Sequence, residues 1–145
     1  MELVTYEPWH FEYLAMPMPQ GRNLGPEVIR MYALAYSIRG EAHTIKDKGK
    51  IVGCAGVLSM WPGVAEAWTI FSKEAKENPF FIHRQTYRIL RKIINKNQFR
   101  RVQAIVCSAD PVSTKWIERL GFVKESVMKK FGADGSDHAM YVWSL

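Results

Sequence analysis

The stretch of sequence that decides the fold runs from Arg101 to Lys124 and reads RVQAIVCSADPVSTKWIERLGFVK. It begins with a short apolar run rich in β-branched residues, Val102 to Val106, which predicts a strand covered on both faces. Asp110 and Pro111 then signal the start of a helix, because proline is tolerated in a first turn. The helix ends before Gly121, which suits a left-handed C-cap. The stretch therefore predicts a strand, a helix and a return to the core.

Hydrophobic periodicity predicts the other elements of an α+β chain. Strand patterns bounded by turn formers lie at residues 3–6, 42–46, 51–60, 64–71, 124–131 and 138–143. Apolar residues at helical spacing predict helices at residues 8–14, at residues 26–39 and from Pro79 onward. The segment from Met16 to Gly25 predicts a loop, because its prolines and glycines disfavour regular structure. The strands between Ala42 and Phe71 follow one another directly, which predicts an antiparallel meander.

Length and composition indicate one globular domain. With 145 residues, 48% of them hydrophobic and 23% charged, the chain is sized for a single domain over residues 1–145. Its longest apolar stretch is interrupted by glycines and is too short to span a bilayer, so we expect a cytoplasmic protein without a membrane partner. Cys54 and Cys107 lie in apolar strand contexts and are interpreted as buried thiols rather than as a disulfide or a nucleophile.

The net charge of +6 is compatible with an anionic ligand, an acidic protein partner or a nucleic acid, and it does not choose among them. The absence of a zinc-finger pattern, an RNA-recognition signature or a contiguous basic tract argues against sequence-specific nucleic-acid recognition. The helix after Pro79 carries Arg84, Arg88, Arg91 and Lys92 opposite its apolar stripe. This cationic face could hold an anionic ligand or partner, or it could be a solvated helix face.

Together with the order of elements, the stretch from Arg101 to Lys124 resembles the C-terminal half of the GCN5-related N-acetyltransferase (GNAT) superfamily. There a strand is followed by a helix with a signature close to A-x-x-x-Y-x-x-x-G-F. The matching positions are Ser113, Ile117, Gly121 and Phe122, so the Gly-Phe ending is kept and the tyrosine is not. The resemblance implies a three-layer α+β fold with a mixed, mostly antiparallel sheet of about seven strands and helices on both faces.

The resemblance also implies an activity, the transfer of an acyl group from acetyl-CoA to an amine. In GNAT enzymes the fourth strand commonly carries a general base, which makes Glu66 the candidate; a solvent-facing glutamate is the alternative. A splay between the fourth and fifth strands would hold the thioester, with backbone N–H groups from Ile70 to Ser72 polarising its carbonyl. Tyr141 and His138 are candidates for the missing acid. The residues implied to contact acetyl-CoA are Thr69, Ile70, Phe71, Ser72, Phe80, Ser113 and Trp116.

The chain departs from the family pattern after the fourth strand. The family normally has R/Q-x-x-G-x-G/A there, whose glycines let N–H groups reach the pyrophosphate. Lys73 to Pro79 reads KEAKENP instead, with no glycine and with two acids where phosphates would lie. This link, the AWTIFS strand and the KWIERLGF ending also resemble small GNAT-like proteins of short-tailed phages. That likeness implies a second hypothesis: a non-catalytic protein, in host cytoplasm or virion, that binds a phage or host protein during virion assembly or host takeover.

Overall fold

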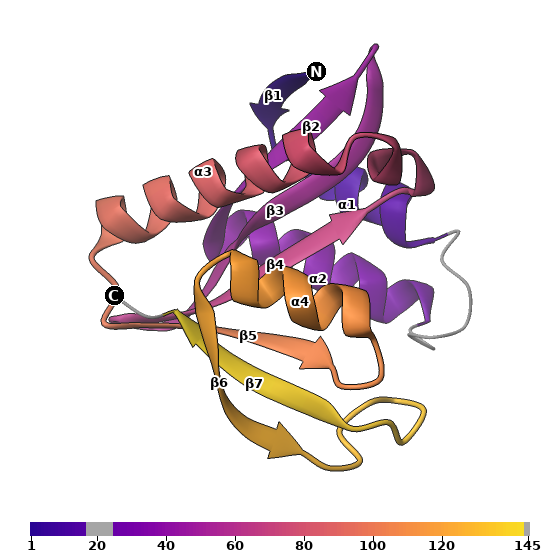
Figure 1. Cartoon of the computed structure of the whole chain (residues 1–145). Helices are drawn as coiled ribbons and strands as arrows, with labels where there is room; N and C mark the ends of the chain where they lie inside the picture. Colours follow the sequence, from indigo (N-terminus) through magenta and orange to yellow (C-terminus); the bar gives the residue numbers. More distant parts are fainter. Residues whose placement is uncertain (17–24, 144–145) are drawn as a thin grey trace.

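The computed structural model describes residues 1–16 and 25–143, and its middle layer is one seven-stranded sheet (Figure 1). The strands are β1 (Glu2–Thr5), β2 (Gly40–Asp47), β3 (Lys50–Trp61), β4 (Val64–Phe71), β5 (Arg101–Cys107), β6 (Phe122–Met128) and β7 (His138–Trp143). They lie in the order β1-β2-β3-β4-β5-β7-β6. Among these strands β4 with β5 is the parallel pair and the other pairs are antiparallel. The predicted mixed, mostly antiparallel sheet is confirmed.

Helices cover both faces of the sheet. The elements are α1 (Pro8–Ala15), α2 (Pro26–Ile38), the short 3-10 helix η1 (Lys73–Glu77), α3 (Pro79–Asn97) and α4 (Pro111–Arg119). Helices α1 and α2 are buried against one side of β4, with Ile70, and we call this the α1/α2 face. Helices α3 and α4 are buried against the other side, with Ala65 and Ala67, and we call this the α3/α4 face. No helix in the described ranges has the length and apolar character that crossing a membrane requires.

The strand-helix-strand unit has the local signals that its sequence predicts. The Asp110 carboxylate accepts the N–H groups of Val112 and Ser113, both at 3.1 Å, and so caps α4. Gly121 has φ 102°, the left-handed conformation that ends the helix. Strand β6 differs from the prediction of 124–131, because it starts directly after Gly121 and the chain turns at Lys130, where φ is 59°. Of the predicted loop from Met16 to Gly25, residues 17–24 lie outside the described part of the chain.

One face of β5 is not covered by helices, so the prediction of cover on both faces was wrong. Val102 and Ala104 are buried with α3 and α4, whereas the alternating residues Arg101, Gln103 and Ile105 are half-buried. Helices α1 and α2 pack on β2, β3 and β4 and stop short of β5. Side chains alternate between the two faces of a strand, and the polar residues Arg101 and Gln103 both lie on the uncovered face.

A chain of buried polar groups ties α1 to the sheet. His10 Nδ1 lies 2.7 Å from Thr44 Oγ1, and this hydroxyl lies 3.3 Å from Cys54 Sγ. The same Nδ1 accepts the Glu7 N–H at 3.1 Å, which assigns the proton of the neutral ring to Nε2. Burial raises the pKa of Cys54 to about 12, so this thiol stays protonated, as a buried structural cysteine does. Cys107, also free, is only half-buried because it lies on the uncovered face of β5.

Acid should weaken the fold through His10. Burial lowers the pKa of His10, with Glu7 opposing the shift and Lys46 adding to it. The unfolded chain then binds this proton more readily, so the stabilisation is complete above the unfolded value of about 6.5 and is lost as the pH falls below it. We expect the urea midpoint to fall between about pH 7.5 and about pH 5.5 in the wild type, and to change much less in His10→Gln. Equal pH slopes in the two proteins would contradict this assignment.

Candidate functional site

Strands β4 and β5 pair along only part of their length. Their parallel register ends at Glu66, which lies opposite Gln103. Strand β4 nevertheless continues to Phe71 and β5 continues to Cys107. Beyond the last pair the two strands diverge, which Figure 1 shows between the arrows of β4 and β5. The predicted splay is present, and we call it the β4/β5 gap.

The gap exposes backbone groups of β4. The Ser72 N–H donates to the Val52 carbonyl at 2.9 Å and so belongs to the contact with β3. Because backbone groups alternate in direction along an antiparallel strand, Thr69 and Phe71 direct theirs to the other side, where β5 no longer pairs. Among the N–H groups predicted to polarise a carbonyl, the one at Phe71 therefore faces the gap, and those at Ile70 and Ser72 face β3.

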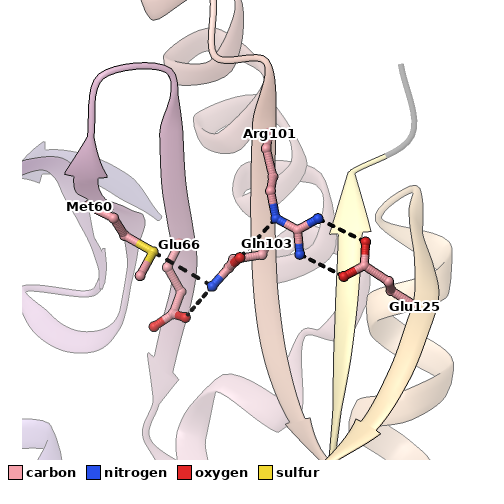
Figure 2. A network of polar contacts seen from close by, with 5 residues as sticks. All are labelled: Met60, Glu66, Arg101, Gln103 and Glu125. Carbon is pink, nitrogen blue, oxygen red and sulfur yellow. Dashed lines mark hydrogen bonds and ion pairs between the residues drawn. The ribbon is translucent and has the colours of Figure 1, made fainter.

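Glu66 lies at the start of the gap, on the α1/α2 face of the sheet, and is held by a network of polar contacts (Figure 2). Its Oε1 accepts a hydrogen bond from Gln103 Nε2 at 3.2 Å. Gln103 Oε1 in turn accepts from Arg101 Nε at 3.0 Å. The Arg101 guanidinium donates to both carboxylate oxygens of Glu125 at 2.8 Å, and this hydrogen bonding lowers the pKa of Glu125. We call Glu66, Gln103, Arg101 and Glu125 the Glu66 network.

Aromatic side chains bridge the gap on the α3/α4 face. The rings of Phe71 and Trp116 meet edge to face, with centroids 5.5 Å apart. Trp116 Nε1 lies 3.1 Å from His83 Nδ1 and donates to it, which links α4 to α3. Phe71 and Trp116, both predicted to contact acetyl-CoA, are thus brought together, and His83 joins them.

The other predicted acetyl-CoA residues lie around this bridge. Thr69 is half-buried, whereas the Ile70 side chain is buried on the α1/α2 face. Phe80 lies in the first turn of α3 and is 86% exposed. Ser113 lies in the first turn of α4, where its Oγ donates to the Asp110 carboxylate at 2.6 Å. The Ser113 hydroxyl therefore serves the cap of α4.

Helix η1 occupies the link in which a glycine loop was expected. The Lys50 ammonium donates to the Glu74 carboxylate at 2.9 Å, and this contact lowers the pKa of Glu74 to about 2. One of the two acids in the link is therefore paired with a cation. Asn78 makes no side-chain hydrogen bond to α3, whose first turn has no acid. The first N–H groups of α3 and the positive end of its dipole are thus open to an anion.

The start of α4 faces η1 across the gap. Hydrogen bonds from Ser113 lower the pKa of Asp110, and the nearby cation of Lys76 in η1 adds to the shift. Lys76 therefore lies close enough to the start of α4 for its charge to act on the Asp110 carboxylate.

The two candidate acids lie apart from Glu66. Gln103 pairs with both Glu66 and Val142, so these residues share a face, and Tyr141 next to Val142 lies on the opposite one. Tyr141 is 2% exposed in the core beneath α3 and α4. His138 shares the Glu66 face, but it pairs four residues further along β5, roughly 13 Å away. The structure does not bring either side chain next to Glu66.

Solved acetyltransferase structures share this arrangement of strands and helices. A mutant of the spermidine N-acetyltransferase SpeG from Vibrio cholerae superposes with a TM-score of 0.76 at 13% identity, covering 99% of this chain and 94% of that one. A GNAT-family acetyltransferase from Streptococcus pneumoniae gives 0.74 at 13% identity, over 97% and 96% of the two chains. A protein from Bordetella pertussis assigned to the GnaT-family acetyltransferases gives 0.72 at 19% identity, over 98% and 94%. The chain has the GNAT fold.

At these identities the likeness establishes the GNAT fold and does not establish an activity, which has to be inferred from the residues of the site. No protein-family model and no curated protein matches the sequence.

Sequence reasoning did not find the residues that hold Glu66 within this GNAT fold. Arg101 and Gln103 were visible as alternating polar residues in an apolar run, and that alternation could have marked them. The role of Glu125 could not be predicted from the sequence, because Glu125 is 24 residues from Arg101 in the chain. The two side chains meet only when β6 pairs with β7 in the sheet.

The contact between α3 and α4 should contribute measurably to stability. Trp116→Phe keeps a ring beside Phe71 but removes the N–H that donates to His83. Since a hydrogen bond contributes about 1 kcal/mol net, we expect the free energy of unfolding to fall by roughly that amount or more. Urea unfolding measures the change, with Trp61→Phe as the matched control because Trp61 is 56% exposed. Equal losses in the two variants would remove the contact from the account of stability.

Proposed function

We propose that this protein transfers an acyl group from acetyl-CoA to an amine, with Glu66 as the general base. The observation that carries the proposal is the end of the β4 and β5 pairing at Glu66, which puts a carboxylate where the sheet opens. A thioester whose carbonyl accepts the N–H of Phe71 would lie five residues, roughly 16 Å, along β4 from Glu66, so proton transfer from the amine to this carboxylate would run through water in the β4/β5 gap. The GNAT fold supports the proposal, since its solved examples include acetyltransferases.

The residues around the gap fit the parts of acetyl-CoA. The extended backbone at Thr69 and Phe71 offers hydrogen-bonding groups to the amides of the pantetheine arm, as an edge strand does to a peptide. The start of α3 suits the pyrophosphate, because its N–H groups have no side-chain cap and Lys76 lies nearby. Phe80, exposed in the same turn, offers an apolar face to the adenine ring.

The proposed reaction is a direct transfer of the acyl group from sulfur to nitrogen, with one proton removed from the amine and one added to the sulfur. Glu66 takes the proton of the amine through intervening water, and the amine nitrogen bonds to the acyl carbon as the carbon–sulfur bond breaks. The N–H of Phe71 stabilises the negative charge that develops on the carbonyl oxygen. The departing sulfur takes its proton from solvent, because the predicted acid Tyr141 is enclosed in the core beneath α3 and α4. Burial raises the pKa of Tyr141, which keeps its phenol protonated at neutral pH.

Replacing the base should separate chemistry from binding. We expect Glu66→Gln to lower kcat by about a hundredfold or more, because general base catalysis is lost, while the affinity for acetyl-CoA and the melting temperature stay unchanged. Turnover is followed with a panel of amines that begins with spermidine, which the Vibrio cholerae neighbour's name specifies. Calorimetric titration with acetyl-CoA measures binding in both proteins.

Glu27→Gln on the exposed side of α2 is the matched control and should leave kcat at the wild-type value. Unchanged turnover in Glu66→Gln would remove Glu66 from the mechanism. No binding at millimolar acetyl-CoA would overturn the proposed function itself.

A second function is favoured by the charge of α3. This helix has no acidic residue, and Arg84, Arg88, Arg91 and Lys92 are exposed along it. In the described part of the chain, Arg84, Arg88 and Lys92 take part in no ion pair. As an alternative we propose a non-catalytic phage protein that uses this face to bind an acidic phage or host protein, as its likeness to small phage proteins implies.

Charge reversal should abolish this alternative binding. The triple variant replaces Arg84, Arg88 and Lys92 by Glu and spares Arg91, whose Nη1 donates to the Tyr87 hydroxyl at 2.7 Å. Fluorescence anisotropy with poly-L-glutamate as the acidic probe should show saturable binding by the wild type and none by the variant. Reversal of three other exposed cations, at Lys115, Arg119 and Lys124, is the control. Equal losses in both triple variants, or retained binding in the first, would count against a specific role for α3.

A further inference from the structure

We propose that Gln103 is a positioning residue for Glu66, and that Arg101 and Glu125 fix Gln103 in this role. The inference rests on the proposed function, because it describes how the base is held before the amine arrives.

The amide of Gln103 has one orientation that fits its contacts. Arg101 Nε can only donate, and it lies 3.0 Å from Gln103 Oε1, so the amide oxygen faces Arg101. The Nε2 group then faces Glu66 Oε1 at 3.2 Å and donates to it. Of the two carboxylate oxygens of Glu66, Oε1 is thereby held, and Oε2 has no hydrogen-bond partner among residues 1–16 and 25–143. The oxygen that stays free is the one that can take a proton.

Arg101 is itself fixed by Glu125. Figure 2 shows the guanidinium on β5 directed over β7 toward the carboxylate on β6. Two parallel hydrogen bonds of 2.8 Å join them, and such a bidentate pair sets the plane of the guanidinium. The direction of Arg101 Nε, and therefore the orientation of the Gln103 amide, follows from this pair.

Two residues that contact Gln103 or Arg101, Met60 and Glu125, each lie in a β-bulge. In β3 the register with β4 shifts around Met60, and the Met60 sulfur lies 3.6 Å from Gln103 Nε2. In β6 the register with β7 shifts around Glu125, the residue that holds Arg101. A bulge re-aims a side chain and is often found beside an active site. Two separate bulges that aim side chains at one glutamine and its partner indicate an arrangement built around Gln103.

The distribution of charge also suits a base. Glu125 compensates the charge of Arg101, and Glu66 takes part in no ion pair in the described ranges of the chain. The neutral amide of Gln103 separates the Arg101 cation from Glu66. Glu66 is therefore oriented by a hydrogen bond without being neutralised by a cation, which leaves it able to bind an ammonium group or accept its proton. Holding it in one geometry reduces the freedom that must be lost when the amine binds.

A double-mutant comparison of acetyl transfer tests the inference. Gln103→Met keeps the length of the side chain and removes its hydrogen bonds. We expect it to lower kcat about tenfold in the wild-type background, with the KM for acetyl-CoA unchanged, and to have no further effect in the Glu66→Gln background. Gln85→Met, at a buried glutamine of α3 outside the network, is the matched control and should keep the wild-type kcat.

A fall in kcat of equal size in both backgrounds would assign Gln103 a general structural role and overturn the inference. An unchanged kcat in Gln103→Met would overturn it as well. A kcat that falls in the wild-type background alone supports it, because that result requires Gln103 to act through Glu66.

A second measurement does not depend on turnover. The side-chain amide of Gln103 gives proton–nitrogen NMR signals that respond to its hydrogen bond with Glu66. Glu66→Ala should shift these signals and speed their exchange with water, whereas Glu27→Ala should leave them in place. Unmoved signals would overturn the inference. If no amine is acetylated but the signals move, the proposed function fails while the contact that positions Glu66 stands.

Discussion

The structure depends on where the backbone pairing between β4 and β5 stops. On either side of the gap the outer ladders continue, β3 with β4 as far as Phe71 and β5 with β7 as far as Cys107. The gap is therefore held open by two well-paired strands rather than by a loose sheet. Backbone N–H and C=O groups that lose their partners must be satisfied by water, side chains or a ligand, because leaving them buried and unpaired is costly. A gap of this kind leaves backbone hydrogen-bonding groups available before any side chain is considered.

The two faces of the sheet treat this gap differently. On the α3/α4 face, Trp116 spans from Phe71 to His83 and closes the sheet with aromatic rings and one hydrogen bond. On the opposite face, the layer formed by α1 and α2 ends at β4, so no helix covers β5 and its side chains Arg101 and Gln103 are half-buried. Glu66 and Gln103 lie at the boundary between the covered and the uncovered half. This asymmetry leaves the Glu66 carboxylate half-exposed while the core beneath it stays packed.

Much of the fold followed from local signals that act over a few residues. The bounds of β4 came from period-two alternation, the start of α4 from Asp110, and its end from the positive φ that only Gly121 adopts easily. Glu66 and the splay came from the family resemblance. The bulges at Met60 and Glu125 could not be predicted, because one extra residue in a strand leaves no mark on its alternation. The contacts of Gln103 and Trp116 join elements that are distant in sequence, so they appear only when the sheet and helices are assembled.

The link between β4 and α3 is built differently from the glycine loop that the family resemblance implied. A glycine loop binds phosphate with several backbone N–H groups that converge on it, and η1 uses its backbone for a helical turn instead. The ion pair with Lys50 compensates the negative charge of Glu74 near the start of α3. Lys76, in the helical turn just before α3, adds a positive charge. The attraction for an anion then comes from the helix dipole and from exposed side chains. Exposed charges are screened within about 8 Å at physiological salt, so an anion must come directly to the end of the helix to be held. In the proposed function, the positive end of α3 would therefore act only at short range, and the β4/β5 gap beside it would have to supply the selectivity.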